Sequence, residues 1–519
     1  MLKQAHNFDE GKRVARRNTR RAGALAVSFI LAGCAVGPDY KKPQTWSPAQ
    51  WQKAATQERS SALSVPTELE PDVQWWAVFH DPELTSLEQR LAAQNLDVLR
   101  ASEQLAVSRG QLLLAGAERF PDLAASGSYS RVQHSSRQLQ RIVERIGSKS
   151  PGLIPDSAAV GDATIPLLNN WQDGVQASWE VDLWGRVRRQ YEAAKSYTDA
   201  SMEERRGILI ARQAELASDY MALRSLQEQL RITTENRDAA AKLLQLSQSR
   251  YKSGLVSELD VDSAQSELQR TNAIIPQYEQ RIAMQINAIN LLMGAPPGGL
   301  NAELVQTAGI PLVPPAVPIG LPSELAHRRP DIREAEAELH AATAEVGQAI
   351  ADFYPKVTID AGFGLQSFSF RDMGMWSSRM WNVGPSITIP IFQGGRLTGQ
   401  LQMKKASQKA AALQYRKTVL NAWREVDNAL TAYQAEQKKN QRLAEQVAAD
   451  RRAMVLAQSQ YRSGLQNYLQ VLDAQRRVLS SQTSLAESTA NISDDLVRLY
   501  NALGGGWETT FPQAQPKHT

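Results

Sequence analysis

The sequence has a single cysteine and few histidines, which limits the chemistry it can support. One cysteine excludes a disulfide within the chain. The six histidines show no spacing typical of metal ligands, and the sequence has no Ser or Cys nucleophile motif and no phosphate-binding loop. His327, in Ala326-His-Arg-Arg-Pro330, is interpreted as a structural residue at a helix start. The sequence therefore predicts a protein that is not an enzyme and binds no metal or cofactor.

The positive charge of the chain is confined to its beginning. The formal net charge is +4 and the isoelectric point is about 9.0, values that would suit a nucleic-acid partner. Residues 1–33, however, carry seven Lys and Arg against Asp9 and Glu10, a net +5 that leaves −1 for the rest. Because nucleic-acid binding needs a basic surface, the near-neutral remainder excludes this partner.

The basic start is followed by about eleven mostly apolar or small residues, Ala22–Ala32. This run is too short for a membrane-spanning helix and is typical of a signal-peptide core. It leads into Leu31-Ala-Gly-Cys34, which resembles a bacterial lipobox, whose cysteine receives a diacylglyceryl group before cleavage. We therefore expect a lipoprotein signal peptide over residues 1–33 and a covalent lipid on Cys34, with Ala35 favouring the outer membrane. The alternative is a buried free cysteine in an uncleaved helix.

One stretch occurs twice and organises the rest of the chain. Tyr251-Lys-Ser-Gly-Leu opens a segment that recurs as Tyr461-Arg-Ser-Gly-Leu, 210 residues later. Gly254 and Gly464 are predicted to form tight turns between antiparallel helices. The same offset aligns Trp171, Gly174, Gly185 and Arg186 with Trp381, Gly384, Gly395 and Arg396. The chain is thus predicted to be an internal duplication.

Proline is missing from two segments long enough for very long helices, about 188–252 and 398–462. Leucines at seven-residue spacing from Leu209 to Leu230 predict knobs-into-holes packing. Return helices are expected over 258–293 and 468–503, the second without the proline that the first has at Pro276. Shorter helices, over 84–118 and 323–352, are expected to feed the strands, the first with Asp81 as its N-cap.

The domain plan follows from this order of elements. We expect a lipid-anchored linker over 34–80, a first repeat over 81–294, a linker over 295–321, a second repeat over 322–504 and a tail over 505–519. The strand-feeding helices end at Phe120-Pro121 and Tyr354-Pro355, which are 234 residues apart. The extra residues of the first repeat are assigned to a long loop near 132–169.

After each of these prolines the hydrophobic period changes to two. Alternating runs near 123–131, 175–183, 357–366 and 382–391 predict four strands with one apolar face, each the length of a tilted transmembrane strand. An ordinary half-buried sheet is the alternative. Four strands cannot close in lipid, so the chain must contribute them to an oligomer. Two copies would supply eight strands around a filled interior, and three would supply twelve and begin to leave a lumen.

Together these residues resemble a known family, the outer-membrane efflux factors or TolC-like channels, and specifically their OprM/NodT-like lipoprotein branch. The resemblance rests on the lipobox with Gly37-Pro-Asp-Tyr-Lys-Lys-Pro43, and on Ala326-His-Arg-Arg-Pro-Asp-Ile332, Pro390-Ile-Phe-Gln-Gly-Gly-Arg396, the paired turns and Leu499-Tyr-Asn-Ala-Leu-Gly-Gly-Gly-Trp507. It implies a mainly α fold with transmembrane β-strands: a trimeric twelve-stranded outer-membrane β-barrel continued by a periplasmic α-barrel. It also implies a passive exit duct for small molecules, a periplasmic adaptor and an inner-membrane pump of the RND type as partners.

The resemblance further implies a gate at the helix tips. The matching residues are Tyr461 at the second turn, Leu469 and Asp473 after it, and Asp260 after the first turn. Three copies of Leu469 would form an apolar constriction and three of Asp473 a carboxylate ring. Some relatives carry Arg where this chain has Gln466, so an Arg latch at that position is not expected. The alternative for both aspartates is a solvated charge on an exposed face.

Two other classes of protein share some of these features. A lipid-anchored periplasmic coiled-coil adaptor would explain the anchor and the hairpins but not four alternating strands. A type I secretion exit duct would share the whole architecture. The sequence identifies neither the cargo nor the cognate pump.

Overall fold

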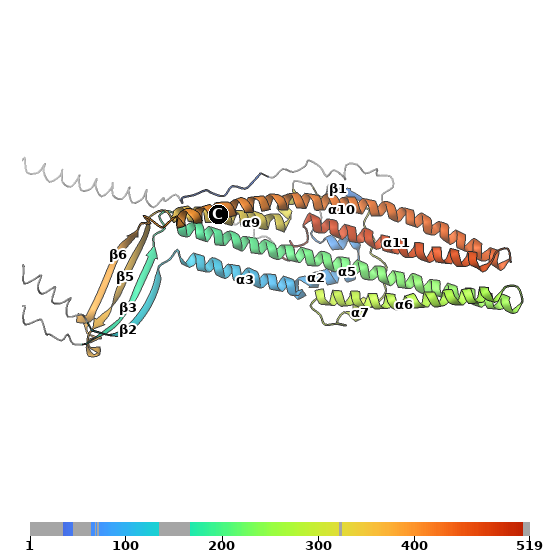
Figure 1. The fold of residues 1–519 in the computed structure, drawn as a ribbon, viewed down its shortest axis with the longest axis horizontal. Coiled ribbons are helices and arrows are strands. Elements are labelled where there is room, and N and C mark those ends of the chain that lie inside the picture. The colour runs from blue at the N-terminus through green and yellow to red at the C-terminus, as the bar shows by residue number, and fades with distance from the viewer. Residues whose placement is uncertain are drawn as a thin grey trace, which may run out of the picture. The chain divides into compact units, whose positions relative to one another are not determined.

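The computed structural model describes residues 35–44, 64–67, 69, 72–133, 167–320 and 324–511 (Figure 1). The predicted signal peptide, Cys34 and nearly all of the predicted long loop lie outside the described residues. The chain forms two compact units. The first contains residues up to Tyr40, Gly110–Lys195 and His340–Gln408, and the second contains the remainder.

The first unit holds the four predicted strands in one antiparallel sheet of order β2-β3-β5-β6 (Figure 1). The strands are β2 (Asp122–Val132), β3 (Leu168–Glu180), β5 (Lys356–Ser367) and β6 (Arg379–Thr388). The last strand ends three residues earlier than its alternating pattern predicts. Pro390 explains this, because it has no N–H for a ladder hydrogen bond.

The strand register places the apolar side chains on one face of the sheet. Ala125 lies opposite Val175, Val175 opposite Phe363, and Phe363 opposite Trp381. These side chains are solvent-exposed in the single chain, Phe363 by 54% and Trp381 by 70%. The other face is polar, and there the Ser178 hydroxyl donates to the Asp360 carboxylate at 2.8 Å. The sheet therefore has one face suited to an apolar medium and one suited to water.

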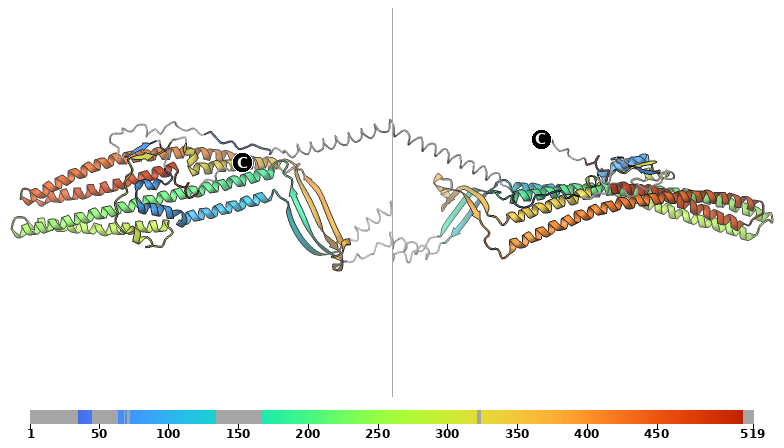
Figure 2. Two further views of the ribbon diagram at one scale, coloured as in Figure 1. Left: turned by 180° about the vertical axis from the view of Figure 1, so that it is seen from behind. Right: turned by 90° about the horizontal axis from the view of Figure 1, so that it is seen from above.

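Two helical hairpins that lie side by side make up most of the second unit, and the first turns of their long helices belong to the first unit (Figure 2). Helices α5 (Arg186–Lys252) and α6 (Glu258–Leu292) form the first, and α10 (Arg396–Arg462) and α11 (Tyr468–Leu503) the second. Of the predicted heptad leucines, Leu209, Leu216 and Leu223 are fully buried and Leu230 is half-buried. In the second copy, Val426 and Leu430 are fully buried. Helix α6 runs through Pro276 without ending.

Each strand-feeding helix is interrupted where the sequence predicted continuity. The first is split into α2 (Pro82–Gln94) and α3 (Leu96–Ala117) because the Asn95 side chain accepts from the N–H groups of Asp97 and Val98 and so caps a new helix. The second is split into α8 (Leu325–Arg328) and α9 (Pro330–Ala351), because Pro330 holds Arg329 in extended conformation. Asp81 caps α2 as predicted, accepting from the Glu83 and Leu84 N–H groups.

The two predicted linkers contain more structure than their composition indicated. Strand β1 (Val65–Thr67) pairs in parallel with β4 (Ala316–Pro318). The first linker also contains the 3₁₀ helix η2 (Trp75–Phe79), and the second contains the short helix α7 (Asn301–Leu304). Trp75 and Trp76 are almost fully buried, so this part of the predicted linker over 34–80 is packed against the rest of the protein. Neither segment shows a periodicity from which such short elements could be predicted.

None of the described helices combines the length and the apolar character that crossing a membrane requires.

Candidate gate at the helix tips

The two helical turns have the same backbone structure. Gly254 and Gly464 adopt φ of +73° and +76°. Each glycine N–H donates to the carbonyl three residues earlier, and the next N–H, of Leu255 or Leu465, donates five residues back. This pair of bonds is the Schellman motif, which satisfies the last carbonyls of a helix and requires a left-handed residue. Both repeated glycines therefore adopt the left-handed conformation at the turn that follows a long helix.

Tyr461 lies at the centre of the tip rather than at its surface. Its ring is 1% exposed and packs edge-on against Tyr468, with the ring centroids 5.6 Å apart. Its hydroxyl lies 3.2 Å from the Ser247 hydroxyl on α5. Burial, together with the nearby carboxylate of Asp260, raises the pKa of Tyr461. The structure thus brings together Tyr461 and Asp260, two of the predicted gate residues.

Arg250 joins the two hairpins and was not singled out by the sequence. Its guanidinium donates to the carbonyl oxygens of Tyr461, at 2.5 Å, and Arg462, at 2.7 Å, at the C-terminal end of α10. The same group lies 4.9 Å from the centroid of the Tyr461 ring. A cation at this end complements the helix dipole and satisfies orphan carbonyls. An arginine therefore links the two hairpins at the tip, but it comes from α5 and not from the position of Gln466.

A buried carboxylate forms a second link between the hairpins. Glu267 on α6 is 2% exposed and pairs with Arg270 of its own helix and with Arg476 on α11, the latter at 2.8 Å. Burial opposes ionisation, but hydrogen bonds from both arginines lower the pKa of Glu267. The pairing with Arg270, three residues along the same helix, could be expected from the sequence, whereas the pairing with Arg476 depends on how the two hairpins pack.

Leu469 and Asp473 lie on the opposite side of α11 from this packed core. Leu469 is 59% exposed and Asp473 is also exposed, whereas Val471 and Leu472 between them are buried. The structure therefore leaves the two predicted gate residues in solvent on one helix face, one turn apart.

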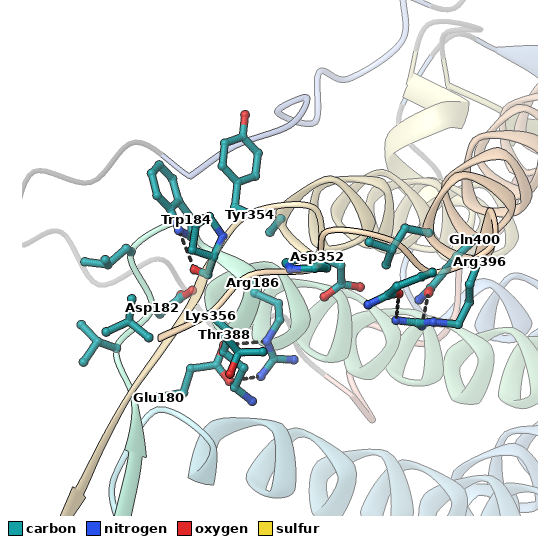
Figure 3. Close-up of a pocket in the computed structure, with 18 residues that line it drawn as sticks. Glu180, Asp182, Trp184, Arg186, Asp352, Tyr354, Lys356, Thr388, Arg396 and Gln400 are labelled. Atoms are coloured by element: carbon teal, nitrogen blue, oxygen red, sulfur yellow. Dashed lines mark hydrogen bonds and ion pairs between the residues drawn. The ribbon is translucent and has the colours of Figure 1, made fainter. Parts of the chain in front are cut away.

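A second polar site lies in the first unit, where the strands become helices (Figure 3). A pocket of about 250 Å³ is lined by residues of β3, α5, β5 and α10. Arg186 donates two hydrogen bonds to the Glu180 carboxylate, at 2.7 and 2.8 Å, and Lys356 pairs with the same group. Trp184 and Tyr354 stack beside it with centroids 4.7 Å apart. Such amphipathic rings favour a membrane–water interface.

The residues that follow the predicted lipidation site lie beside this pocket. The N–H of Val36 donates to the Trp184 carbonyl at 3.0 Å, and Asp39 pairs with Arg189 at 2.5 Å. A Cβ at Gly185 would be 2.7 Å from the Ala35 side chain, so the glycine allows this approach. Cys34 itself lies outside the described residues. Within the described ranges, no group of three or more His, Cys, Asp or Glu side chains is placed to hold a metal ion.

Comparison with known proteins agrees with this geometry. The chain is 31% identical to the probable efflux pump outer membrane protein TtgC of Pseudomonas putida, over 96% of this chain and 98% of that protein. It is 27% identical to nodulation protein T of Rhizobium leguminosarum bv. trifolii, over 92% and 96% of the two chains. The solved outer-membrane channel OprN superposes with a TM-score of 0.81 at 31% identity, over 92% of this chain and 100% of that one.

The family comparison extends over both repeats and confirms the resemblance noted in the sequence. The model of the outer membrane efflux protein family matches residues 87–295 and 321–505, which together make up most of the chain. The gap between the two matches falls within the linker that carries α7 and β4. The chain belongs to the outer membrane efflux protein family.

Proposed function

We propose that this protein is the outer-membrane channel of a tripartite efflux system, a passive homotrimeric duct that carries small toxic molecules to the cell exterior. The observation that supports it most directly is the four-stranded sheet, apolar on one face and polar on the other, whose strands lead into helices of 67 residues. The relatives named as efflux pump outer membrane proteins support the same role. The alternative function, a coiled-coil adaptor, does not explain such a sheet.

The number of strands supports three copies. Four strands per chain leave open edges, which lipid does not tolerate. Three copies supply twelve strands, enough to leave an aqueous lumen, which the face carrying Ser178 and Asp360 would line. The exposed apolar face would then contact lipid. The duct catalyses no reaction and holds no cofactor; a periplasmic adaptor and an inner-membrane pump would supply coupling and energy.

The same proposal includes a lipid anchor on Cys34. Its support is the lipobox sequence and the position of Ala35 and Val36 beside Trp184 and Tyr354, the aromatic pair suited to a membrane interface. Two or three acyl chains would hold the N-terminus at the outer membrane. Mass spectrometry of the purified protein tests this directly: the mature chain should begin at Cys34 and carry the added mass of the acyl groups. A chain that keeps residues 1–33 would refute it.

Leu469 and Asp473 are proposed to close the periplasmic end. In a trimer three Leu469 side chains would form a constriction that excludes water, and three Asp473 carboxylates would favour cations. Arg250, Glu267 and Tyr461 would hold the two hairpins of each chain in the closed position, since each bonds across them.

Planar-bilayer recording tests both the channel and the gate. The purified trimer should show a small, mostly closed conductance that rises in Leu469→Ala and in Asp473→Ala. Leu259→Ala is the matched control, because Leu259 is the repeat counterpart of Leu469 and is also exposed, at 72%, on α6. Unchanged currents in both gate variants would remove these residues from the gate. No conductance from any variant would refute the channel and favour a lipid-anchored structural protein.

A further inference from the structure

The apolar face of the sheet changes character at its outer end, where β2 finishes and β3 begins. The strand register arranges the side chains of this face in rows that cross the strands. The last rows are Gly127, Asp173, Leu365 and Arg379, then Tyr129, Trp171 and Ser367, then Arg131 and Asn169. Farther in, the described strand residues of this face are uncharged. Two arginines therefore belong to the face that is otherwise suited to lipid.

The outer rows lie at the depth of the headgroups when the sheet spans a membrane. Trp171 and Val181, just beyond the inner end of β3, are ten positions apart, about 33 Å along a strand. A strand tilt of about 40° reduces this to roughly 25 Å, the height of the apolar band of an outer-membrane barrel. The rings of Tyr129, Trp171 and Phe370 are in contact at this level, with centroids 4.3 and 4.9 Å apart. Aromatic girdles mark the edges of such a band.

We infer that Arg131 and Arg379 bind the phosphate groups of a glycolipid headgroup in the outer leaflet of the outer membrane. The inference rests on the proposed channel function and adds a lipid that the channel recognises. Both side chains are exposed, and neither forms an ion pair within the described residues. Asp173 belongs to the same rows, but it accepts a hydrogen bond from the Leu365 N–H at 3.3 Å and pairs with neither arginine in the described part of the chain.

The side chain of Arg379 reaches outward from the apolar band. Its guanidinium lies 4.5 Å from the centroid of the Trp376 ring and donates to the Trp376 carbonyl at 2.7 Å. Trp376 belongs to the connection between β5 and β6, beyond the strand end. An arginine that snorkels to the interface in this way costs far less than one at the bilayer midplane. The carbonyl uses one of the five guanidinium N–H donors, which leaves others for phosphate oxygens.

The inner end of the sheet is built differently. There Arg186 and Lys356 both pair with Glu180, which belongs to the polar face. The apolar face at that end carries Val357 opposite Ile387. Within the described strands, arginine on the lipid-facing side is thus confined to the end that would reach the outer leaflet. This asymmetry favours a ligand that only the outer leaflet contains.

The separation of the two arginines indicates the kind of headgroup. They lie on β2 and β6, which are three strand spacings, or about 14 Å, apart in the sheet. A headgroup with a phosphate at each end of a disaccharide can meet both guanidiniums where they lie, whereas a single phosphate would have to draw them together. Lipid A, the glycolipid of the bacterial outer leaflet, has this chemistry. Arginine suits it because its planar fork binds two phosphate oxygens at once.

Lipid binding by the purified protein tests the site. Full-length, lipidated protein in detergent is titrated with diphosphoryl lipid A, and bound lipid is counted by native mass spectrometry. The native protein should bind this lipid about tenfold more tightly than monophosphoryl lipid A. Arg131→Leu and Arg379→Asn should each weaken binding about tenfold and remove the preference. The strands should tolerate both changes, because the other repeat has Leu365 and Asn169 at the corresponding positions.

Arg442→Gln is the matched control for the loss of one charge from each chain. Arg442 lies on α10, away from the strands, and its side chain is 78% exposed. This variant should bind diphosphoryl lipid A like the native protein. An equal loss in the control would show a non-specific charge effect and overturn the site. Unchanged binding in both strand variants, or full displacement of the lipid by inorganic phosphate, would also overturn it.

Bilayer recording of the same proteins separates the lipid site from the channel on which it rests. Arg131→Leu and Arg379→Asn should conduct like the native protein, because both positions lie on the lipid-facing side and not on the polar face. Normal conductance with weakened lipid binding supports the site and excludes misfolding. Native conductance without any preference between the two lipids overturns the site while the channel proposal stands. A native protein that neither conducts nor binds lipid A refutes the channel itself.

Discussion

Replacing Arg250 by Gln should open the channel, because it removes the cation that joins the two hairpins at the tip. Glutamine is the residue that the second repeat carries at the corresponding position, Gln460, so the helix itself should tolerate it. The shorter amide cannot reach the carbonyls of Tyr461 and Arg462, which Arg250 bonds at 2.5 and 2.7 Å.

The size of the effect follows from the interactions that the guanidinium makes. A hydrogen bond from a charged donor contributes about 1.5–3 kcal/mol, and the lower end applies here because one of the two acceptors is exposed. The cation–π interaction with the Tyr461 ring adds about 0.5–1 kcal/mol. In the variant, water solvates the freed carbonyl groups, which offsets part of the lost interaction energy. A net loss of about 2–3 kcal/mol per chain changes the ratio of closed to open tips by roughly 30- to 140-fold.

Open probability in planar bilayers is the measurement, supported by thermal unfolding of the same preparations. Arg237→Gln is the matched control, since Arg237 lies on the same helix and, within the described part of the chain, forms its ion pair with the adjacent Asp238 rather than across the hairpins. Arg250→Gln should raise open probability strongly and the control should not. Reduced thermal stability with an unchanged open probability would show that Arg250 stabilises the fold without keeping the channel closed, and would refute this prediction.

Three further predictions concern burial, charge and backbone. Glu88 is fully buried, neither oxygen has a partner among the described residues, and burial raises its pKa well above the usual value. The contribution of Glu88 to stability is therefore present below about pH 4.3 and is lost as the pH rises through the raised pKa. Glu88→Leu should increase the free energy of unfolding by about 1–3 kcal/mol. Thermal melts should show a larger increase at pH 8 than at pH 5. Glu267 has a lowered pKa, so its contribution is present above about pH 4.3 and lost as pH falls through the lowered value. Open probability of the native channel should rise in that acidic range, and Glu267→Gln should flatten the dependence; equal slopes would contradict this. Gly254→Ala should cost about 1–2 kcal/mol by strain alone in chemical denaturation, because φ is +73° and the space around it is open, and Gly254→Asn should cost less.

Much of the fold could be predicted because its periodicities are long and regular. The spacing of Leu209 to Leu223 predicted the heptad core, and the repeated Tyr-x-Ser-Gly-Leu predicted both turns. Alternation over about ten residues predicted the four strands and their apolar face. Shorter signals failed, as at Asn95, where a side chain caps a new helix within a continuous apolar pattern.

The sequence by itself determined the duplication, the element types and the family, because each depends on repeated or periodic residues that leave a mark along the chain. Tertiary structure alone decided which side chains hold the tip. Arg250 bonds residues more than 200 positions away, and Glu267 meets Arg476 across two helices. Such pairs depend on the relative placement of two hairpins, and no local pattern encodes that placement. In the sequence, a polar residue that faces water cannot be distinguished from one that bonds another helix. Only the packing of the helices determines which of the two it contacts.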